Sequence, residues 1–598
     1  MKTVKVINKI LAGIIIIAVF FLVVGVAYSY YVARLSGAET KTSVTGTTGA
    51  LKMEYDGGPE LIASSIAPST NPFITKTFTV KGYNTSNIQL YYQVKIIVDE
   101  NTFSEDAITY TLTGSNTSEN GNPIPNITTR TPINQETISL GIGNFTDNIT
   151  NVVHTYELNL YFYQTETDQL QDLGKTFKAH VTLEDIDYRF DVEKGVNRPV
   201  LFTGMTPVIW DESFNETETT FNNPEWYDYN AKKWANAKTA DGSYWVWIPR
   251  YAYKITSGYQ SSTTGTIDIK FLRGTTNDND SSTNIKPTEE YNADTKNTSM
   301  HHFLHPAFDV EGSKLGFWIA KYEPTAAEGV VSGAGSCDSA DNVSTKTIKV
   351  IPGATSWRCI NISNAYNATL NMKTNSTYGW LSSKVNPHML TNIEWGAVTY
   401  LSKSTYGANT KEIWNNAYNQ YRTGCSGTGV NANSESTCVV YNTTDGVNAS
   451  TTHNIYGVYD MSGGAWERVM GNYNNLPASS GFNTVESVTN IPAKYISRYT
   501  TATEDLLNGV GMAYDTTIYG DAVYETSYNA YRYNGTAWEG NGAGSWYGDH
   551  SYLPHTSLPW FSRGGYWGSG TVAGLFSFIG TNGSASVSGS FRPAVGGG

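Results

Sequence analysis

Histidine side chains are the first groups through which this chain could do chemistry. His301, His302 and His305 form a His-His-x-x-His cluster, and His550 and His555 flank a short loop. Imidazole ligands of a metal need carboxylate or carbonyl partners to hold them in place, and the surrounding sequence offers no recognisable set. Nothing in the chain resembles a nucleophile elbow or a phosphate-binding glycine loop. We therefore predict neither a catalytic site nor a metal at these histidines.

The cysteines all lie in the second half of the chain. They fall into two local pairs, Cys337 with Cys359 and Cys425 with Cys438. Neither pair has the Cys-x-x-Cys spacing typical of a zinc or redox site. An even number of cysteines in an extracellular protein indicates disulfide bonds. We predict two structural disulfides with these pairings.

Composition separates the chain from several classes of protein. Of its 598 residues 16% are charged and 13% are aromatic, and Asn, Ser, Thr and Gly crowd the loops. This profile is typical of an extracellular protein rich in β-structure. The net charge is −13 and no basic stripe offsets it. Nucleic acid is therefore excluded as a partner, because its phosphates would be repelled.

The N-terminus predicts the location of the protein. Residues 1–9 contain three lysines and precede an apolar run over residues 10–32, which is long enough to cross a bilayer core of roughly 30 Å. The lysines stay in the cytoplasm, so the bulk of the chain is expected outside a single-pass cell membrane anchor. The alternative is a cleaved signal peptide ending near Ser36-Gly37-Ala38. Residues 33–48 are expected to be a linker.

Residues 49–190 alternate apolar and polar side chains with a period of two. Leu90, Tyr92, Val94, Ile96 and Val98 follow this pattern, and turns rich in Asn, Gly, Ser and Pro separate such segments. The pattern predicts an all-β sandwich, jelly-roll-like, that serves as a stalk. Behind an N-terminal anchor it loosely resembles the TasA/camelysin-like envelope proteins of Gram-positive bacteria, which implies a surface-exposed or fibre-forming module. A generic spacer domain is the alternative.

Residues 191–224 are acidic and rich in Thr and Asn, so we predict a second linker there. In residues 225–598 tryptophan becomes frequent and five motifs follow one another in a fixed order. They lie at Ser243–Ile255, Leu315–Thr325, His388–Leu401, Ile455–Tyr473 and Ser562–Val595. Together they resemble the formylglycine-generating-enzyme-like, or sulfatase-modifying-factor, superfamily. The resemblance spans roughly residues 205–595 and implies a C-type-lectin-like, mixed α/β domain with long loops.

Two local features follow from these motifs. The segment Thr391–Leu401 places Ile393, Ala397 and Leu401 at four-residue intervals, which predicts a short amphipathic helix with Glu394 in its first turn. Trp466 is expected to be a core anchor in the Gly-Gly-Ala-Trp-Glu turn.

The resemblance implies two kinds of chemistry, and the chain keeps neither in full. The oxidising enzymes of the superfamily bind copper through a cysteine pair near the C-terminus, but this chain has no cysteine after Cys438. We therefore predict that it is not an enzyme. The family's calcium turn usually reads Gly-Asn-x-Trp-Glu, and here Gly464 replaces the Asn while Glu467 remains. No cofactor is predicted, and calcium at Glu467 stays open.

The last forty residues combine small polar side chains with regularly placed aromatic ones. They resemble the variable segments of diversity-generating-retroelement proteins, a non-enzymatic branch of the fold in which Asn codons are randomised. Eleven positions hold residue types reachable from AAC or AAT by changing adenines, and we expect them to face outward as a ligand-binding face: Tyr566, Gly568, Ser569, Val572, Ser577, Ile579, Thr581, Ser584, Ser586, Val587 and Ser588. The expected scaffold comprises Trp466, Trp567, Phe576, Phe578, Phe591 and Arg592. The alternative is a fixed loop of ordinary small residues.

Three functions are compatible with this organisation. The first is a membrane-anchored receptor or adhesin whose head binds a protein or glycan ligand on a cell, host or phage surface, with aromatic anchors among adaptable small residues. The second is a structural subunit of a surface fibre or biofilm matrix, which would assemble through strand edges of the stalk. The third is an enzyme of the sulfatase-modifying-factor type, which we rank last because the cysteine pair is missing.

Overall fold

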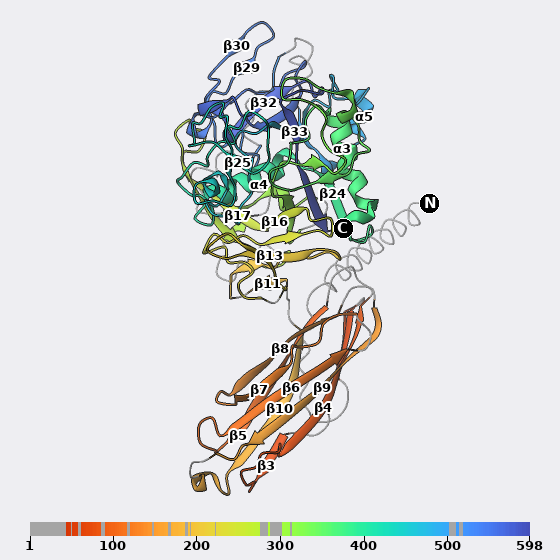
Figure 1. The fold of residues 1–598 in the computed structure, drawn as a ribbon, viewed down its shortest axis with the longest axis vertical. Helices are drawn as coiled ribbons and strands as arrows, with labels where there is room; N and C mark the ends of the chain where they lie inside the picture. Colours follow the sequence, from red (N-terminus) through yellow and green to blue (C-terminus); the bar gives the residue numbers. More distant parts are fainter. Residues whose placement is uncertain are drawn as a thin grey trace, which may run out of the picture. The chain divides into compact units, whose positions relative to one another are not determined.

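The computed structural model describes residues 44–597 except 49–50, 58–60, 85–89, 117–119, 146–148, 166–168, 186–188, 192, 222, 276–284, 287–301, 311–313, 501–509 and 514–517. The chain divides into two compact units, Met1–Tyr188 and Arg189–Gly598 (Figure 1). The basic segment 1–9 and the apolar run 10–32 lie outside the described residues. Within the described part, no helix is long and apolar enough to span a bilayer.

The described strands of the first unit form two antiparallel sheets (Figure 1). The larger has the order β1-β2-β4-β9-β6-β7, from β1 (Val44–Thr48), β2 (Leu51–Asp56), β4 (Ile74–Asn84), β9 (Ile149–Phe162), β6 (Ile108–Asn116) and β7 (Ile127–Pro132). The smaller has the order β3-β10-β5-β8, from β3 (Leu61–Ser64), β10 (Thr176–Asp185), β5 (Leu90–Asn101) and β8 (Thr137–Phe145). Strand β1 thus begins inside the stretch 33–48 that we had expected to be a linker.

One hydrophobic core takes side chains from both sheets of the first unit. Val80 and Leu158 come from the larger sheet and Val94 and Val181 from the smaller, and all four are completely buried. The period-two pattern explains this packing, because alternate side chains of a strand point to one face. The predicted all-β sandwich is therefore confirmed for this unit.

The second unit is built on a seven-stranded sheet with the order β14-β13-β15-β16-β21-β34-β24. Its strands are β13 (Thr206–Trp210), β14 (Glu216–Glu218), β15 (Asn236–Lys238), β16 (Tyr244–Pro249), β21 (Gly316–Ala320), β24 (Val385–Met389) and β34 (Pro593–Gly597). The C-terminal strand β34 pairs with β21 on one side and β24 on the other. The end of the chain is therefore an interior part of this sheet.

A second sheet has the order β28-β27-β31-β32, with β33 also paired to β27. Its strands are β27 (Trp466–Tyr473), β28 (Ser497–Tyr499), β31 (Trp560–Gly564), β32 (Gly574–Thr581) and β33 (Gly589–Phe591). A third sheet has the order β18-β17-β20-β19, from β17 (Tyr251–Ser257), β18 (Thr266–Phe271), β19 (Ile285–Lys286) and β20 (His302–Leu304). Two-stranded pairs are β11 (Phe190–Asp191) with β12 (Val196–Asn197), β22 (Thr325–Ala326) with β23 (Ile348–Lys349), β25 (Cys425–Ser426) with β26 (Val439–Val440), and β29 (Arg532–Tyr533) with β30 (Trp538–Glu539).

The described α-helices of this unit are α3 (Ile362–Asn371), α4 (Asn392–Lys403) and α5 (Val485–Thr489). Helix α4 is the one predicted from the four-residue apolar spacing. Thr391 and Glu394 close its N-terminus as a capping box, in which each side chain accepts from the other residue's backbone N–H. This arrangement satisfies donors that the helix itself leaves free.

The interpretation of residues 191–224 as a linker was wrong. This stretch contains part of β11 and all of β12, β13 and β14, and β13 pairs with both β14 and β15. Val208 is completely buried and Trp210 is 6% exposed. The acidic, Asn-rich composition concealed one short apolar strand, Pro207 to Trp210, which joins the main sheet of the second unit.

Candidate binding surface at the C-terminal segment

A buried ion pair fixes the C-terminal segment to the rest of the second unit. Arg592 lies between β33 and β34 and is completely buried, as is Glu467 on β27. The guanidinium donates from Nε to Glu467 Oε2 at 2.7 Å and from Nη2 to Glu467 Oε1. It also donates to the carbonyl oxygens of Ala320 and Tyr459, at 2.8 and 2.9 Å. Arg592 thus has the scaffold position predicted for it.

Glu467 does not lie in an open cation site. Both of its oxygens accept hydrogen bonds from Arg592, and two further carboxylates, Glu323 and Asp460, lie close enough to influence them. Burial, together with Asp460 and Glu467, raises the pKa of Glu323 well above its usual range. This shift favours the protonated form of Glu323, which limits the negative charge beside Arg592.

Two more buried arginines hold the backbone of the segment. Arg468 donates to the carbonyl oxygens of Ile360 and Ser584, and Arg358 donates to that of Val587. The backbone N–H of Cys359 donates to the Ser586 carbonyl at 2.9 Å. These bonds tie the carbonyl groups of Ser584, Ser586 and Val587 to buried residues, and the side chains of residues 584–587 are partly exposed.

Both predicted disulfides are present. Cys337 is bonded to Cys359 across a separation of 22 residues, and Cys425 to Cys438 across 13. The backbone of Cys359 is hydrogen-bonded to the C-terminal segment. The Cys337–Cys359 disulfide therefore helps to hold that segment in place.

The predicted scaffold aromatics divide into two groups. Phe576, Phe578 and Phe591 are completely buried, as predicted. Trp466 and Trp567 are only partly buried, so the expectation that they are core anchors was wrong. The Trp567 ring lies 5.5 Å from that of Tyr566 and the Trp466 ring 5.5 Å from that of His550. These two tryptophans form part of an accessible aromatic surface.

The candidate variable positions are accessible with one exception. Ten of the eleven are partly exposed: Tyr566, Gly568, Ser569, Val572, Ile579, Thr581, Ser584, Ser586, Val587 and Ser588. Ser577, in contrast, is completely buried. It lies in β32, along which the segment around Ser551 packs: Phe578 donates to the His550 carbonyl at 2.9 Å and accepts from Tyr552 at 3.0 Å. The prediction that Ser577 faces outward was therefore wrong.

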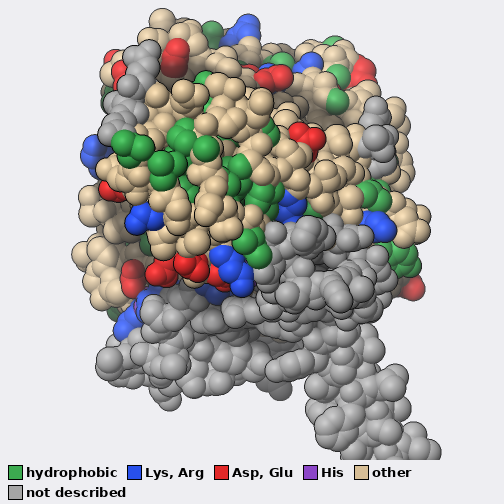
Figure 2. Space-filling view, turned by 90° about the horizontal axis from the view of Figure 1, so that it is seen from below, with side chains coloured by type: hydrophobic (Ala, Val, Ile, Leu, Met, Phe, Trp, Pro, Cys, Tyr) green, Lys and Arg blue, Asp and Glu red, His purple; other side chains and the backbone are tan. Residues whose placement is uncertain are grey.

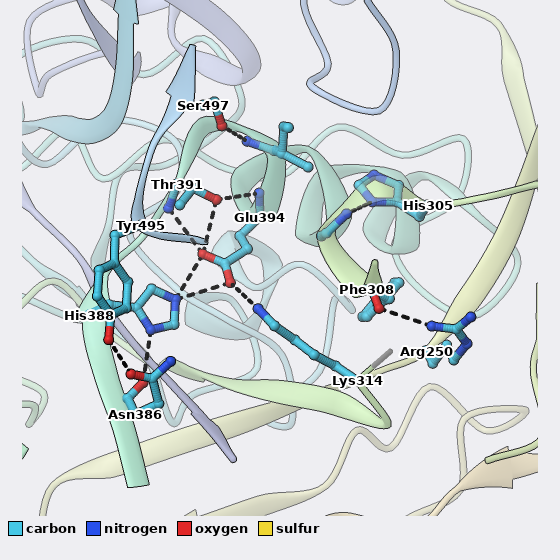
Figure 3. A network of polar contacts seen from close by, with 12 residues as sticks. Arg250, His305, Phe308, Lys314, Asn386, His388, Thr391, Glu394, Tyr495 and Ser497 are labelled. Atoms are coloured by element: carbon cyan, nitrogen blue, oxygen red, sulfur yellow. Dashed lines mark hydrogen bonds and ion pairs between the residues drawn. The ribbon is translucent and has the colours of Figure 1, made fainter. Parts of the chain in front are cut away.

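A network of polar side chains in the second unit contains a His–Glu pair of the kind found in catalytic sites, but the pair is buried away from solvent (Figure 3). His388 Nε2 lies 3.0 Å from Glu394 Oε1, and its Nδ1 lies 2.9 Å from the Asn386 carbonyl oxygen. Both side chains are at most 2% exposed, and Lys314 Nζ lies 3.5 Å from the same carboxylate. Because Glu394 also caps α4, we assign this network a role in stabilising the fold and not in binding a substrate.

Glu394 predicts a pH dependence of stability. Burial alone would raise its pKa, but His388 and Lys314 lower the pKa to about 2, from an ordinary value of 4.5. A depressed folded-state pKa contributes stability above the unfolded value, and this contribution is lost as the pH falls from about 4.5 to about 2. We expect the unfolding midpoint of the second unit to fall over this window. The variant Glu394→Gln should be less stable at neutral pH and should show a flatter profile; an equally steep profile would contradict this assignment.

The histidines of the predicted cluster lie in different environments. His302 pairs with Asp268 at 2.8 Å, whereas His305 is completely buried and accepts from the backbone of Ala307. Burial lowers the pKa of His305 to about 3. The residue His301 lies outside the described residues. Among those described, no cluster of three metal-ligating side chains occurs.

A small pocket opens beside Lys403, Glu412, Tyr547 and Phe576. Lys403 Nζ donates to Tyr547 Oη at 2.7 Å. Burial lowers the pKa of Lys403 to about 8 and raises that of Glu412 to about 7. The pocket is far too small for a ligand of drug size, and its polar groups already bond to each other. This pocket is therefore a weaker candidate than the C-terminal face.

Comparisons with known proteins do not indicate a function for this chain, so the proposal below rests on its geometry. No family model, no curated protein and no solved structure matches this chain.

Proposed function

We propose that this chain is a membrane-anchored cell-surface binding protein, a receptor or adhesin. Its second unit is a C-type-lectin-like head resembling the non-enzymatic branch of the formylglycine-generating-enzyme-like superfamily, and its C-terminal face binds a protein or glycan ligand. One observation carries the proposal: ten positions, most of them small residues, are partly exposed on a backbone that buried arginines and a disulfide hold in place. Such a surface can change its side chains while its conformation is kept.

The chemistry of the surface supports a ligand other than nucleic acid. None of the ten accessible positions is Lys or Arg. A different face of the molecule, seen from below in Figure 2, likewise carries mostly uncharged polar side chains and backbone, with hydrophobic side chains gathered on it and Lys and Arg side chains scattered among the described residues. A phosphate backbone is bound by clustered basic side chains. Tyr and Trp among Ser, Gly and Asn are the composition that preorganised binding loops use.

A fibre subunit is the second candidate, and the first unit supplies an observation in its favour. In the described structure, β1 and β7 end the larger sheet and β3 and β8 end the smaller. Outer strands of this kind can pair with a strand of another molecule. A receptor should remain a monomer in solution, whereas a fibre subunit should polymerise.

Sequencing of codons 560–595 across a natural population tests the proposal. We expect variation at the ten accessible positions and a small residue retained at Ser577, because that side chain is completely buried. An Asn-rich template repeat beside a reverse transcriptase gene would add the mechanism of diversification. An invariant segment would contradict a diversified face and leave a fixed-specificity surface protein.

Tyrosine substitutions test the same distinction in the protein. Ser584→Tyr and Ile579→Tyr add bulk at partly exposed positions, so each should change the free energy of unfolding by only about 0.5 kcal/mol. Ser577→Tyr forces the same ring into a closed site and should cost at least about 1–3 kcal/mol. Chemical unfolding followed by tryptophan fluorescence measures all three. A tolerated Ser577→Tyr would mean that the segment around Ser551 opens easily.

A further inference from the structure

A second aromatic surface lies on the hairpin formed by β29 and β30, outside the C-terminal segment (Figure 1). Trp538 is 38% exposed and Tyr528 is 61% exposed. Among the described residues of the second unit these are the two aromatic side chains that are more than a third exposed. Both lie within one short segment, and exposed apolar groups that gather in one place mark interaction sites more often than scattered ones do.

Four further rings surround Trp538. The ring of Tyr533 lies 5.7 Å from it, that of Tyr552 5.7 Å, that of His555 5.3 Å and that of Tyr531 6.0 Å. These five rings are called the Trp538 platform below. Separations of this size are those of rings in direct contact. The platform is therefore a packed aromatic cluster in which Trp538 is exposed, the three tyrosines are partly exposed and His555 is buried.

The backbone beneath the platform is held on two sides. Tyr531 donates to the Ser551 carbonyl and accepts from Leu553, both at 2.8 Å. Gly542 passes so close that a Cβ there would lie 2.7 Å from Tyr552 Oη and 2.8 Å from the Tyr531 ring. The rings thus have their positions before any ligand arrives, which reduces the entropy lost on binding.

The rim of the platform is polar and carries balanced charge. Arg532 and Glu539 are directly opposite each other across the hairpin. Asn534 Nδ2 donates to Glu539 Oε1 at 2.5 Å, and Asn541 is exposed beside it. Amide and carboxylate groups therefore surround an aromatic surface that has no net charge to attract an ionic partner.

We propose that the Trp538 platform binds a neutral polysaccharide. One face of a hexose ring presents C–H groups that pack flat on an indole or phenol ring, while its hydroxyl groups lie at the edge, where amides and carboxylates can bond them. The platform supplies rings for the C–H face and polar groups for the hydroxyls. Like a neutral polysaccharide, it carries no net charge. A protein partner would favour anchors that fill apolar pockets, whereas this cluster offers the accessible Trp538 ring, on which a sugar can stack. The site is separate from the eleven C-terminal positions, so its existence does not depend on their diversification.

Affinity electrophoresis of the full chain tests this site. Native gels containing mixed-linkage β-glucan, mannan, galactomannan or xylan are compared with gels without polysaccharide. We expect the protein to be retarded by at least one of the four. Trp538→Ala should weaken that retardation by about tenfold or more, whereas Trp538→Tyr, which keeps a ring, should retain most of it.

Tyr83→Ala supplies a matched control, because Tyr83 is an exposed aromatic residue of the first unit. This variant should migrate like the unchanged protein. Asn534→Ala should weaken retardation without removing a ring, which keeps the test informative if Trp538→Ala unfolds. Absence of retardation in all four gels, or equal retardation of the Trp538→Ala variant, would overturn the proposal. Loss of retardation by Tyr83→Ala would also overturn it, since binding would then involve the other unit.

Discussion

Replacing Glu467 with Gln is expected to lower the free energy of unfolding of the second unit by about 3–5 kcal/mol. The substitution removes the carboxylate that accepts two hydrogen bonds from the completely buried guanidinium of Arg592. Breaking one side of a buried pair costs far more than the pair contributes, because the remaining charge has been removed from water. Urea unfolding followed by tryptophan fluorescence reports this unit selectively, since every tryptophan of the chain lies at or after Trp210.

A double variant separates the contribution of the buried charges to stability from that of side-chain packing. Glu467→Leu with Arg592→Met removes both charges, and we expect it to recover part of the loss seen with Glu467→Gln. Recovery should be incomplete, because Arg592 also donates to the carbonyl oxygens of Ala320 and Tyr459. A Glu467→Gln variant as stable as the unchanged protein would contradict the assigned role of the ion pair.

Phe578→Ala is expected to cost about 3–5 kcal/mol, whereas Trp567→Ala should cost clearly less. Phe578 is completely buried in β32, and its removal leaves a cavity in the core. Trp567 is larger but only partly buried. Unfolding curves of the two variants, measured side by side, check the order. If Trp567→Ala were the more harmful, Trp567 would be a core anchor after all.

This order also bears on function. If Trp567 belongs to the binding face, the Trp567→Ala variant should remain folded and lose affinity for its ligand. Phe578→Ala, in contrast, should lose binding only in proportion to its loss of folded protein.

The sequence by itself determined the features that depend on near neighbours along the chain. The alternation around Val94 predicted buried strands, because the period of two is a property of each strand. The local spacing of the cysteines predicted both disulfides, and the four-residue spacing after Thr391 predicted helix α4. The burial of Phe576 and Phe578 also follows from their type and alternation.

Only the tertiary structure decided which side chains are covered by distant segments. Ser577 has the same small, polar character as Ser584, yet it is buried because residues around Ser551 pack along β32. Glu467 resembled a metal ligand until Arg592, 125 positions away, was found to occupy its oxygens. The Trp538 platform likewise depends on pairing between residues 531 and 552. Local periodicity sets the face on which a side chain lies, but packing between distant segments determines what that face meets.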